Sequence, residues 1–270
     1  MLKINSAYKN FLPLLFSGFY FISVGATADI VDWNTPDGIQ RLENSKYKGD
    51  FFSLAPQFEG QENKVFCGVA SATIVLNAFR AGKDSYNIQP DSSVISHSEL
   101  TYFPKENNWS PFWKRYTQNS VVNVSPKSKI NIFGKPLKEG DKPDYGLNLN
   151  DESALLKAEG INVRKVHVTS IKNIPAMKKE IIQALADPTK YVIVNYLRTA
   201  LGQQGGGHFS PLGAWDKKSN SFLIMDVSNT THRWVWVDSN DLFKAMNTED
   251  GDSRRGYLIV NDTPKPAGNN

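Results

Sequence analysis

Residues 66–80, with the sequence FCGVASATIVLNAFR, limit the possible folds most strongly, because they are apolar on almost every side of a helix. Polar residues precede this segment and Gly82 follows it, which is how a buried helix commonly begins and ends. A helix that is apolar all round has to be packed inside the protein. The segment therefore predicts a central buried helix with Cys67 and Gly68 in its first turn.

Cys67 is the one cysteine among 270 residues. An intramolecular disulfide and any cluster of several thiolates are therefore excluded. The free N–H groups and the dipole of a helix N-terminus favour the thiolate, so we expect a lowered pKa and a nucleophilic role for Cys67. The alternative is that it serves only as a small buried hydrophobic residue.

The remaining pattern predicts a single α+β domain with two lobes, helices first and an antiparallel sheet last. Residues 84–145 predict short helices and long loops. Helices are expected at residues 151–159 and 176–186, and apolar or aromatic runs predict strands. These strands are residues 191–196, 207–215, 221–227, 233–237 and 257–260.

The first residues resemble an export signal. Lys3 and Lys9 precede an apolar run at residues 11–24, and a small-residue site follows it. We expect cleavage after Ala28, a mature domain of residues 29–270, and a location in a bacterial periplasm or outside the cell. The run is shorter than the ~20 residues of a membrane span, so no stable insertion is expected after cleavage. A net charge of +4 without a basic tract argues against a nucleic-acid partner.

A thiol nucleophile needs a base and a group that orients the base. His208 follows three glycines and begins a predicted strand, which makes it the best candidate among four histidines. Asp226 ends an apolar run on the next predicted strand, where a carboxylate needs a partner. His208 follows Cys67 by about 140 residues, which matches the spacing of papain-like enzymes, ~130–150 residues.

Acyl chemistry also needs hydrogen-bond donors for the oxyanion. The backbone N–H of Cys67 is the first candidate, because it lies at a helix start. A glutamine side chain a short distance upstream is the natural second donor. Gln61 is better placed than Gln57, since it lies six residues before Cys67.

Several segments together resemble the phytochelatin synthase family, especially its short bacterial forms. They are GQENKVFCGVASATIVLNAF, VIVNYLRTALGQQGGGHFSPLGAW, FLIMDVS, LFKAMNTED and SRRGYLIV, and the resemblance extends over about residues 61–260. It implies a papain-like cysteine protease fold with Cys67 as the nucleophile and His208 as the base. It also implies that Asp226 orients the base and that Gln61 supplies the oxyanion donor.

The resemblance further implies a binding site for the γ-glutamyl end of glutathione. Asp250 and Arg255 match the family positions, and an acid beside a guanidinium suits a zwitterionic α-amino acid. Arg255 is preferred to its neighbour Arg254 because of the RGY match. Gly207 and Asn195, from the motif around His208, are added to the expected substrate-binding set.

The implied reaction breaks the Cys–Gly bond of glutathione, releases glycine and leaves a γ-glutamylcysteinyl thioester on Cys67. Water then gives γ-glutamylcysteine, whereas a second glutathione gives a phytochelatin. No cysteine follows Cys67, unlike the Cys-rich region of long eukaryotic forms, and residues 228–233 replace a Tyr-Pro-Pro stretch common in the family. We therefore expect hydrolysis to be favoured over transfer.

Neither a structural metal nor a bound cofactor is expected, because the histidines lack ligand spacing. Cadmium or zinc would enter as a thiolate complex of glutathione, which would connect the enzyme to metal detoxification. A homodimer is compatible with the resemblance. Two other functions are considered: a papain-like peptidase with the same three residues that acts on other peptides, and an exported non-catalytic module that binds glutathione or its metal complexes.

Overall fold

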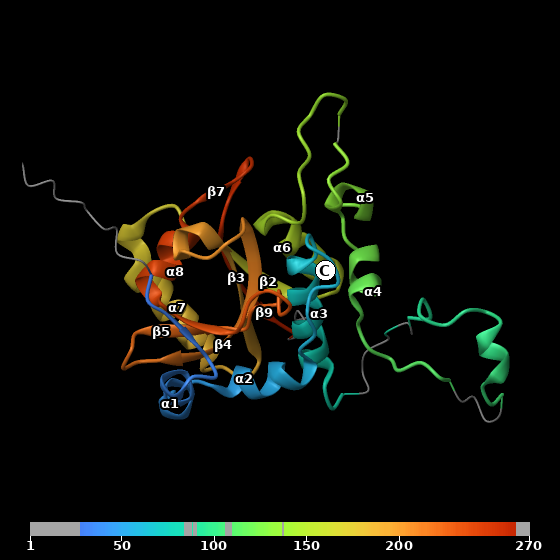
Figure 1. Ribbon diagram of the computed structural model, residues 1–270, viewed down its shortest axis with the longest axis horizontal. Helices are drawn as coiled ribbons and strands as arrows, with labels where there is room; N and C mark the ends of the chain where they lie inside the picture. Colours follow the sequence, from blue (N-terminus) through green and yellow to red (C-terminus); the bar gives the residue numbers. More distant parts are fainter. Residues whose placement is uncertain (1–27, 84–87, 89–90, 106–109, 137, 263–270) are drawn as a thin grey trace, which may run out of the picture.

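The computed structural model describes residues 28–83, 88, 91–105, 110–136 and 138–262, and a seven-stranded antiparallel sheet is their largest element (Figure 1). The strand order is β1-β6-β5-β4-β3-β9-β2. A separate two-stranded hairpin joins β7 to β8. The strands are β1 (Ile30–Asp32), β2 (Asn162–His167), β3 (Lys190–Leu197), β4 (Gly207–Asp216), β5 (Ser221–Ile224), β6 (Val235–Asp238), β7 (Glu249–Asp250), β8 (Ser253–Arg254) and β9 (Gly256–Asn261).

Helices cover both faces of the sheet. On one face lie α3 (Cys67–Arg80) and α6 (Leu149–Ala158), with α4 (Gln118–Asn123) packed against α3. On the other face lie α7 (Ile174–Leu185) and α8 (Ser239–Met246). The remaining helices are α1 (Pro36–Asn44), α2 (Gly49–Leu54), α5 (Lys129–Ile132), and the 3₁₀ turns η1 (Ala55–Gln57), η2 (Glu99–Tyr102), η3 (Ile171–Asn173) and η4 (Arg198–Leu201).

Strand β3 shows why the sheet carries a core on each face. Tyr191 and Ile193 point to the α3 side, and Val192 and Val194 point to the α7 and α8 side. Successive side chains of a strand alternate between the two faces. A strand buried on both faces therefore has a continuous apolar run, as residues 191–194 do.

Helix α3 is the buried helix that the sequence predicts. Every residue after Cys67 is buried as far as Phe79. Its end is also as expected, since the Ala81 N–H donates to the Asn77 carbonyl and Gly82 adopts a left-handed φ of +72°. The Cys67 end has no side-chain cap, so its backbone N–H groups are not taken up by a capping side chain.

The prediction of a mixed α and β fold with an antiparallel sheet is confirmed, and the predicted helices and strands lie within about two residues of those observed, except at the end of β5. The expected order of helices before sheet is wrong. Strand β1 precedes α3, β2 lies between helices, and α8 lies between β6 and β9. The two strands of the large sheet that the prediction missed, β1 and β2, form its edges, and the short hairpin of β7 and β8 was missed as well. Both edge strands are only partly buried and have no apolar run that would mark them.

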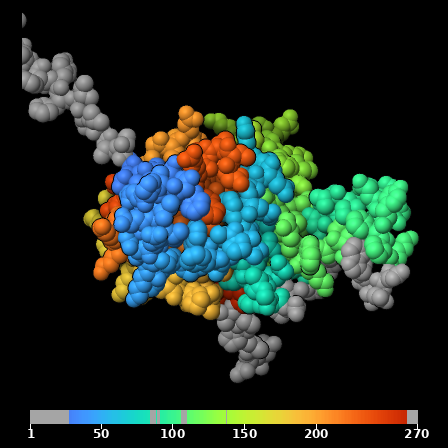
Figure 2. Space-filling model, turned by 60° about the horizontal axis from the view of Figure 1, so that its bottom comes forward, coloured from blue at the N-terminus to red at the C-terminus, as the bar shows by residue number. Residues whose placement is uncertain are grey.

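Asp226 requires a second correction, because β5 ends at Ile224 and Asp226 lies in the segment that follows it. Between α3 and α4, the described residues form loops with one short 3₁₀ turn, as predicted. Part of this stretch projects from the body of the protein (Figures 1 and 2), whereas Ile88 and Tyr116 are buried in the core. Apart from Ala28, the predicted leader lies outside the described residues. Among the helices of the described part, none has the length and apolar character to cross a membrane.

Candidate active site

Cys67 is the first residue of α3, and its sulfur lies beside the start of β4. The backbone N–H groups of Phe209 and Gly68 both favour the Cys67 thiolate by hydrogen bonding. Phe209 directly follows His208 in β4. The packing of α3 against β4 therefore brings the sequence neighbourhoods of the predicted nucleophile and base together.

His208 and Asp226 form a buried hydrogen-bonded pair. Nε2 of His208 lies 3.0 Å from Oδ1 of Asp226, and the exposed fractions of the two residues are 5% and 0%. When Nε2 carries the proton that faces the carboxylate, Nδ1 is the unprotonated nitrogen that can accept another. The ring of Tyr196, which pairs with His208 across β3 and β4, packs edge-on against the imidazole at 5.7 Å.

Asp226 is held by more donors than the predicted histidine alone. Arg198, which begins η4, lies 2.8 Å from Oδ2 through Nη1 and donates to Oδ1 from Nη2 at 2.9 Å. The Ser228 N–H donates to Oδ1 at 2.8 Å and the Tyr196 hydroxyl to Oδ2 at 3.4 Å. Burial alone would raise the pKa of Asp226, but His208 and Arg198 outweigh it and hold that pKa well below its usual range.

The expected lowering of the Cys67 pKa is wrong. Desolvation of the sulfur raises the pKa of the thiol to about 11, and the charge of Glu152 adds to the rise. The backbone N–H groups and Arg198 oppose this rise without reversing it. Burial also lowers the pKa of His208, although Asp226 favours its charged form. At neutral pH, Cys67 is therefore a thiol and His208 a neutral imidazole. The thiol can lose its proton only if a base accepts it.

Gln61 is attached to the segment that follows Asp226, because its N–H donates to the Val227 carbonyl at 2.8 Å. One N–H of its carboxamide donates to the Asn63 carbonyl at 2.6 Å. An amide nitrogen has two protons, so the second remains available as an oxyanion donor. Gln57, the weaker candidate, lies at the end of η1, one element further from Cys67.

The four predicted substrate-binding residues lie together. Arg255 reaches Oδ1 of Asp250 at 2.6 Å, and Asn195 donates to the other oxygen at 3.4 Å. A Cβ on Gly207 would lie 2.5 Å from Nη2 of Arg255, so a side chain at this position would force the guanidinium to shift. Burial raises the pKa of Asp250, although Arg255 and Asn195 both favour its charged form.

Arg254 points away from this group, as the preference for Arg255 requires. It donates to Oδ1 of Asn247 at 2.8 Å and pairs with Glu249 at 3.5 Å. Arg255 is 6% exposed, and its Nε has no hydrogen-bond partner among the described residues. In the same part of the chain, Oδ1 of Asn195 is likewise buried and unpartnered. A buried donor and a buried acceptor therefore remain unsatisfied in one group, as expected of a binding site.

The two groups of predicted residues adjoin each other through strands β3 and β4. Gly207 packs on Arg255 and directly precedes His208. Asn195 pairs with Phe209, whose N–H bonds the Cys67 sulfur. A ligand held by Asp250 and Arg255 would therefore contact residues that are sequence neighbours of His208 or pair with them across the sheet.

Arg198 and Glu152 escaped the sequence prediction. Arg198 directly follows the apolar run of β3, and Asp226 lies at the end of the apolar run that begins in β5. Because a buried charge needs a partner, the two residues could have been predicted to pair. Glu152 follows Leu149 by three residues and precedes Leu156 by four, which places it on the buried face of α6. Helical spacing was therefore a usable signal for Glu152.

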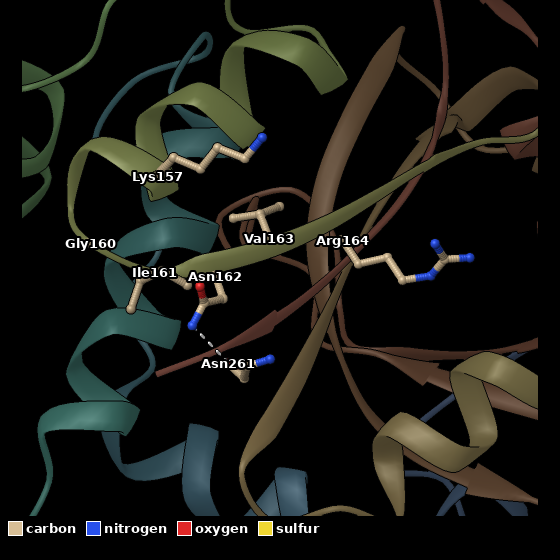
Figure 3. Close-up of a pocket in the computed structure, with 7 residues that line it drawn as sticks. All are labelled: Lys157, Gly160, Ile161, Asn162, Val163, Arg164 and Asn261. Atoms are coloured by element: carbon tan, nitrogen blue, oxygen red, sulfur yellow. Dashed lines mark hydrogen bonds between the residues drawn. The ribbon is translucent and has the colours of Figure 1, made fainter. Parts of the chain in front are cut away.

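An open groove of about 780 Å³ lies elsewhere, along edge strand β2 and the end of α6 (Figure 3). None of the predicted site residues lines it; the lining is Lys157, Gly160, Ile161, Asn162, Val163, Arg164 and Asn261. Within the described ranges, no three His, Cys, Asp or Glu side chains form a group that could hold a metal ion.

A cysteine at a helix start, bonded to the N–H that follows the histidine of a buried His–Asp pair, has the types of group that thiol-dependent acyl transfer or hydrolysis needs. The family model of phytochelatin synthase matches residues 23–91 and 90–257, so the chain belongs to the phytochelatin synthase family.

Similar proteins include glutathione gamma-glutamylcysteinyltransferase 3 of Lotus japonicus, which is 25% identical over 236 residues and aligns with 85% of this chain and 42% of its own length. The Schizosaccharomyces pombe glutathione gamma-glutamylcysteinyltransferase is 26% identical over 230 residues, with 84% and 46% covered. The chain therefore spans less than half the length of these curated relatives.

Proposed function

We propose that this protein cleaves the Cys–Gly bond of glutathione through a γ-glutamylcysteinyl thioester on Cys67. The observation that carries the proposal is the contact of Gly207 with Arg255, since it joins the Asp250–Arg255 pair directly to the residue before His208. Arg255 suits the α-carboxylate of the γ-glutamyl end, and Asp250 suits its ammonium group. The names of the relatives support the same substrate.

The first half of the reaction forms the thioester. The Cys67 proton passes to Nδ1 of His208 as the sulfur attacks the cysteinyl carbonyl carbon, and Asp226 stabilises the imidazolium. The Gln61 carboxamide and the Cys67 N–H donate to the oxyanion. When the C–N bond breaks, His208 returns the proton to the nitrogen of glycine, which leaves as a neutral amine.

In the second half, His208 removes a proton from water, the hydroxyl oxygen attacks the thioester carbon, and the proton returns to the Cys67 sulfur. The product is γ-glutamylcysteine. A second glutathione that attacks through its amino group instead would give a phytochelatin. We expect the water reaction to be favoured, and cadmium or zinc to act as a thiolate complex of glutathione.

The test is incubation of the mature protein with glutathione, followed by mass analysis of small molecules and of the intact protein. Glycine, γ-glutamylcysteine and an acyl adduct on Cys67 are expected, and Cys67→Ser should yield none of them while folding normally. Equal cleavage of an ordinary Xaa-Cys-Gly tripeptide would favour a general peptidase. A binding module would be favoured if Cys67→Ser bound glutathione as the wild type does and neither protein released glycine. Phytochelatin formed faster than γ-glutamylcysteine, with cadmium present, would refute the preference for water.

A further inference from the structure

Glu152 of α6 is a buried acid that the proposed reaction does not use. Its exposed fraction is 0%. Neither carboxyl oxygen has a hydrogen-bond partner in the part of the chain that the structure describes. A carboxylate buried in this way is strongly destabilised, whereas the neutral acid is tolerated much better.

The carboxyl of Glu152 lies against the first turn of α3. A Cβ built on Gly68 would lie 2.5 Å from Oε2 of Glu152 and 3.1 Å from a methyl carbon of Leu147. Gly68 directly follows Cys67. The absence of a side chain at position 68 therefore allows an acid to approach the start of the helix that carries the nucleophile.

The surrounding charges act on this acid and on the thiol in opposite ways. Burial, with a contribution from Asp151 on the same helix, raises the pKa of Glu152 to about 8. The negative charge of Asp151 is partly balanced by Lys127, whose Nζ lies 3.6 Å from Oδ2 of Asp151. Across the site, the charge of Glu152 disfavours the Cys67 thiolate and that of Arg198 favours it.

We propose that Glu152 is a positioning residue that controls the ionisation of the Cys67 thiol through the first turn of α3. While Glu152 keeps its proton, no negative charge lies beside the helix start and the thiol can pass its proton to His208. When Glu152 releases its proton to solvent, the carboxylate opposes the thiolate. The proposal concerns the nucleophile of the proposed function, but it does not require glutathione to be the substrate.

The test is the rate at which iodoacetamide alkylates the full chain between about pH 6 and pH 10. Because Cys67 is the one cysteine, the mass of the protein reports on that residue alone. Glu152→Gln should react roughly threefold to tenfold faster than the wild type above about pH 8, since a tenfold change corresponds to one pKa unit of the thiol. At about pH 6, where Glu152 is neutral in the wild type, the two rates should agree.

Asp50→Asn is the matched control, because Asp50 in α2 is also a buried acid whose pKa burial raises to about 8. It does not act on Cys67 and should alkylate as the wild type does. Profiles of Glu152→Gln and wild type that coincide throughout would overturn the proposal. These readings use no glutathione, so they separate this proposal from the proposed function.

A spectroscopic measurement keeps the proposal testable if Glu152→Gln fails to fold. Infrared spectra of Asp50→Asn should show the band of a protonated carboxyl, that of Glu152, at about pH 7, and this band should disappear by about pH 9. Over the same interval, the alkylation of Cys67 should rise less steeply with pH than an isolated thiol would predict. A spectrum of Asp50→Asn without such a band at about pH 7 would show that Glu152 is already ionised, which would overturn the proposal.

Discussion

Asp226 and Glu152 are two fully buried carboxyls near the same cysteine, and their environments leave the first ionised and the second neutral at pH 7. Asp226 accepts hydrogen bonds from His208, Arg198, a backbone N–H and a tyrosine hydroxyl, and its pKa is held low. Glu152 has no hydrogen-bond partner among the residues placed by the structure, and its pKa rises to about 8. Equal burial therefore does not determine the charge of an acid; its partners do.

The difference divides the site into two sides. On the β4 side, the permanent carboxylate of Asp226 would stabilise His208 when it becomes positive in the proposed reaction. On the α6 side, the neutral acid of Glu152 places no negative charge of its own beside Cys67, which would become negative in the same proposed reaction. Each carboxyl therefore has, at neutral pH, the charge that the proposed reaction would require beside its neighbour.

The comparison is tested most strongly by Asp226→Asn, which removes the charge and keeps the shape. We expect a loss of about 3–5 kcal/mol in the free energy of unfolding at pH 7, because Arg198 is left buried without a counter-ion. Chemical denaturation measures this loss. In the double variant Asp226→Leu with Arg198→Met, which replaces the pair by apolar groups, much of the stability should return.

The same pair has a pH signature. The pKa of Asp226 is lower in the folded protein than in the unfolded chain, so its contribution to stability is present above about pH 4 and is lost as the pH falls further. The stability gap between wild type and Asp226→Asn should narrow on acidification below about pH 4. A gap of less than 1 kcal/mol at pH 7 would show that the ion pair does not hold the site together.

Glu152→Gln tests the other carboxyl and should have the opposite sign. The pKa of Glu152 is about 8 in the folded protein against 4.5 for a free side chain, so the folded state keeps a proton that the unfolded chain releases. The wild type therefore loses stability as the pH rises from about 4.5 to about 8. Relative to it, Glu152→Gln should gain about 2–4 kcal/mol between about pH 5 and pH 9. Parallel stability curves over that interval would contradict this expectation.

The adjacent residues Arg255 and Arg254 allow an arginine inside the proposed binding site to be compared with one outside it. Arg255→Lys should raise KM for glutathione at least about tenfold, because a lysine cannot reproduce the planar fork that faces Asp250. Arg254→Lys, which changes the same chemistry next door, should stay within about twofold. Steady-state release of glycine measures both, and equal effects of the two substitutions would remove Arg255 from the proposed binding site.

The smallest effect is expected where a charge pair is exposed. Arg164 of β2 pairs with Glu180 of α7, and the Arg164 side chain is 63% exposed. Arg164→Ala should cost about 0.2–1 kcal/mol of unfolding free energy, and less in high salt. Thermal unfolding at two salt concentrations would measure it. A cost that approaches that of Asp226→Asn would mean that burial is not what separates the strong pair from the weak one.

Much of this site was predictable because local patterns reported on it. Continuous apolar runs located α3 and the central strands, and a charge at the end of such a run singled out Asp226. The match to RGY selected Arg255 over Arg254, and the side-chain contacts agree. Edge strand β2 was missed because Arg164 and Lys165 are exposed there, and only pairing with β9 makes that segment a strand.

The sequence by itself determined which residues are available for chemistry: a single cysteine at a helix start, a histidine after glycines and an acid at the end of an apolar run. Periodicity and local backbone preferences are sufficient for this, since they depend on neighbours along the chain. The charges on those residues were decided by the tertiary structure alone. The Cys67 pKa rises instead of falling because desolvation and Glu152, 85 positions away in the sequence, outweigh the helix start. Such balances depend on packing between distant segments, which no local pattern records.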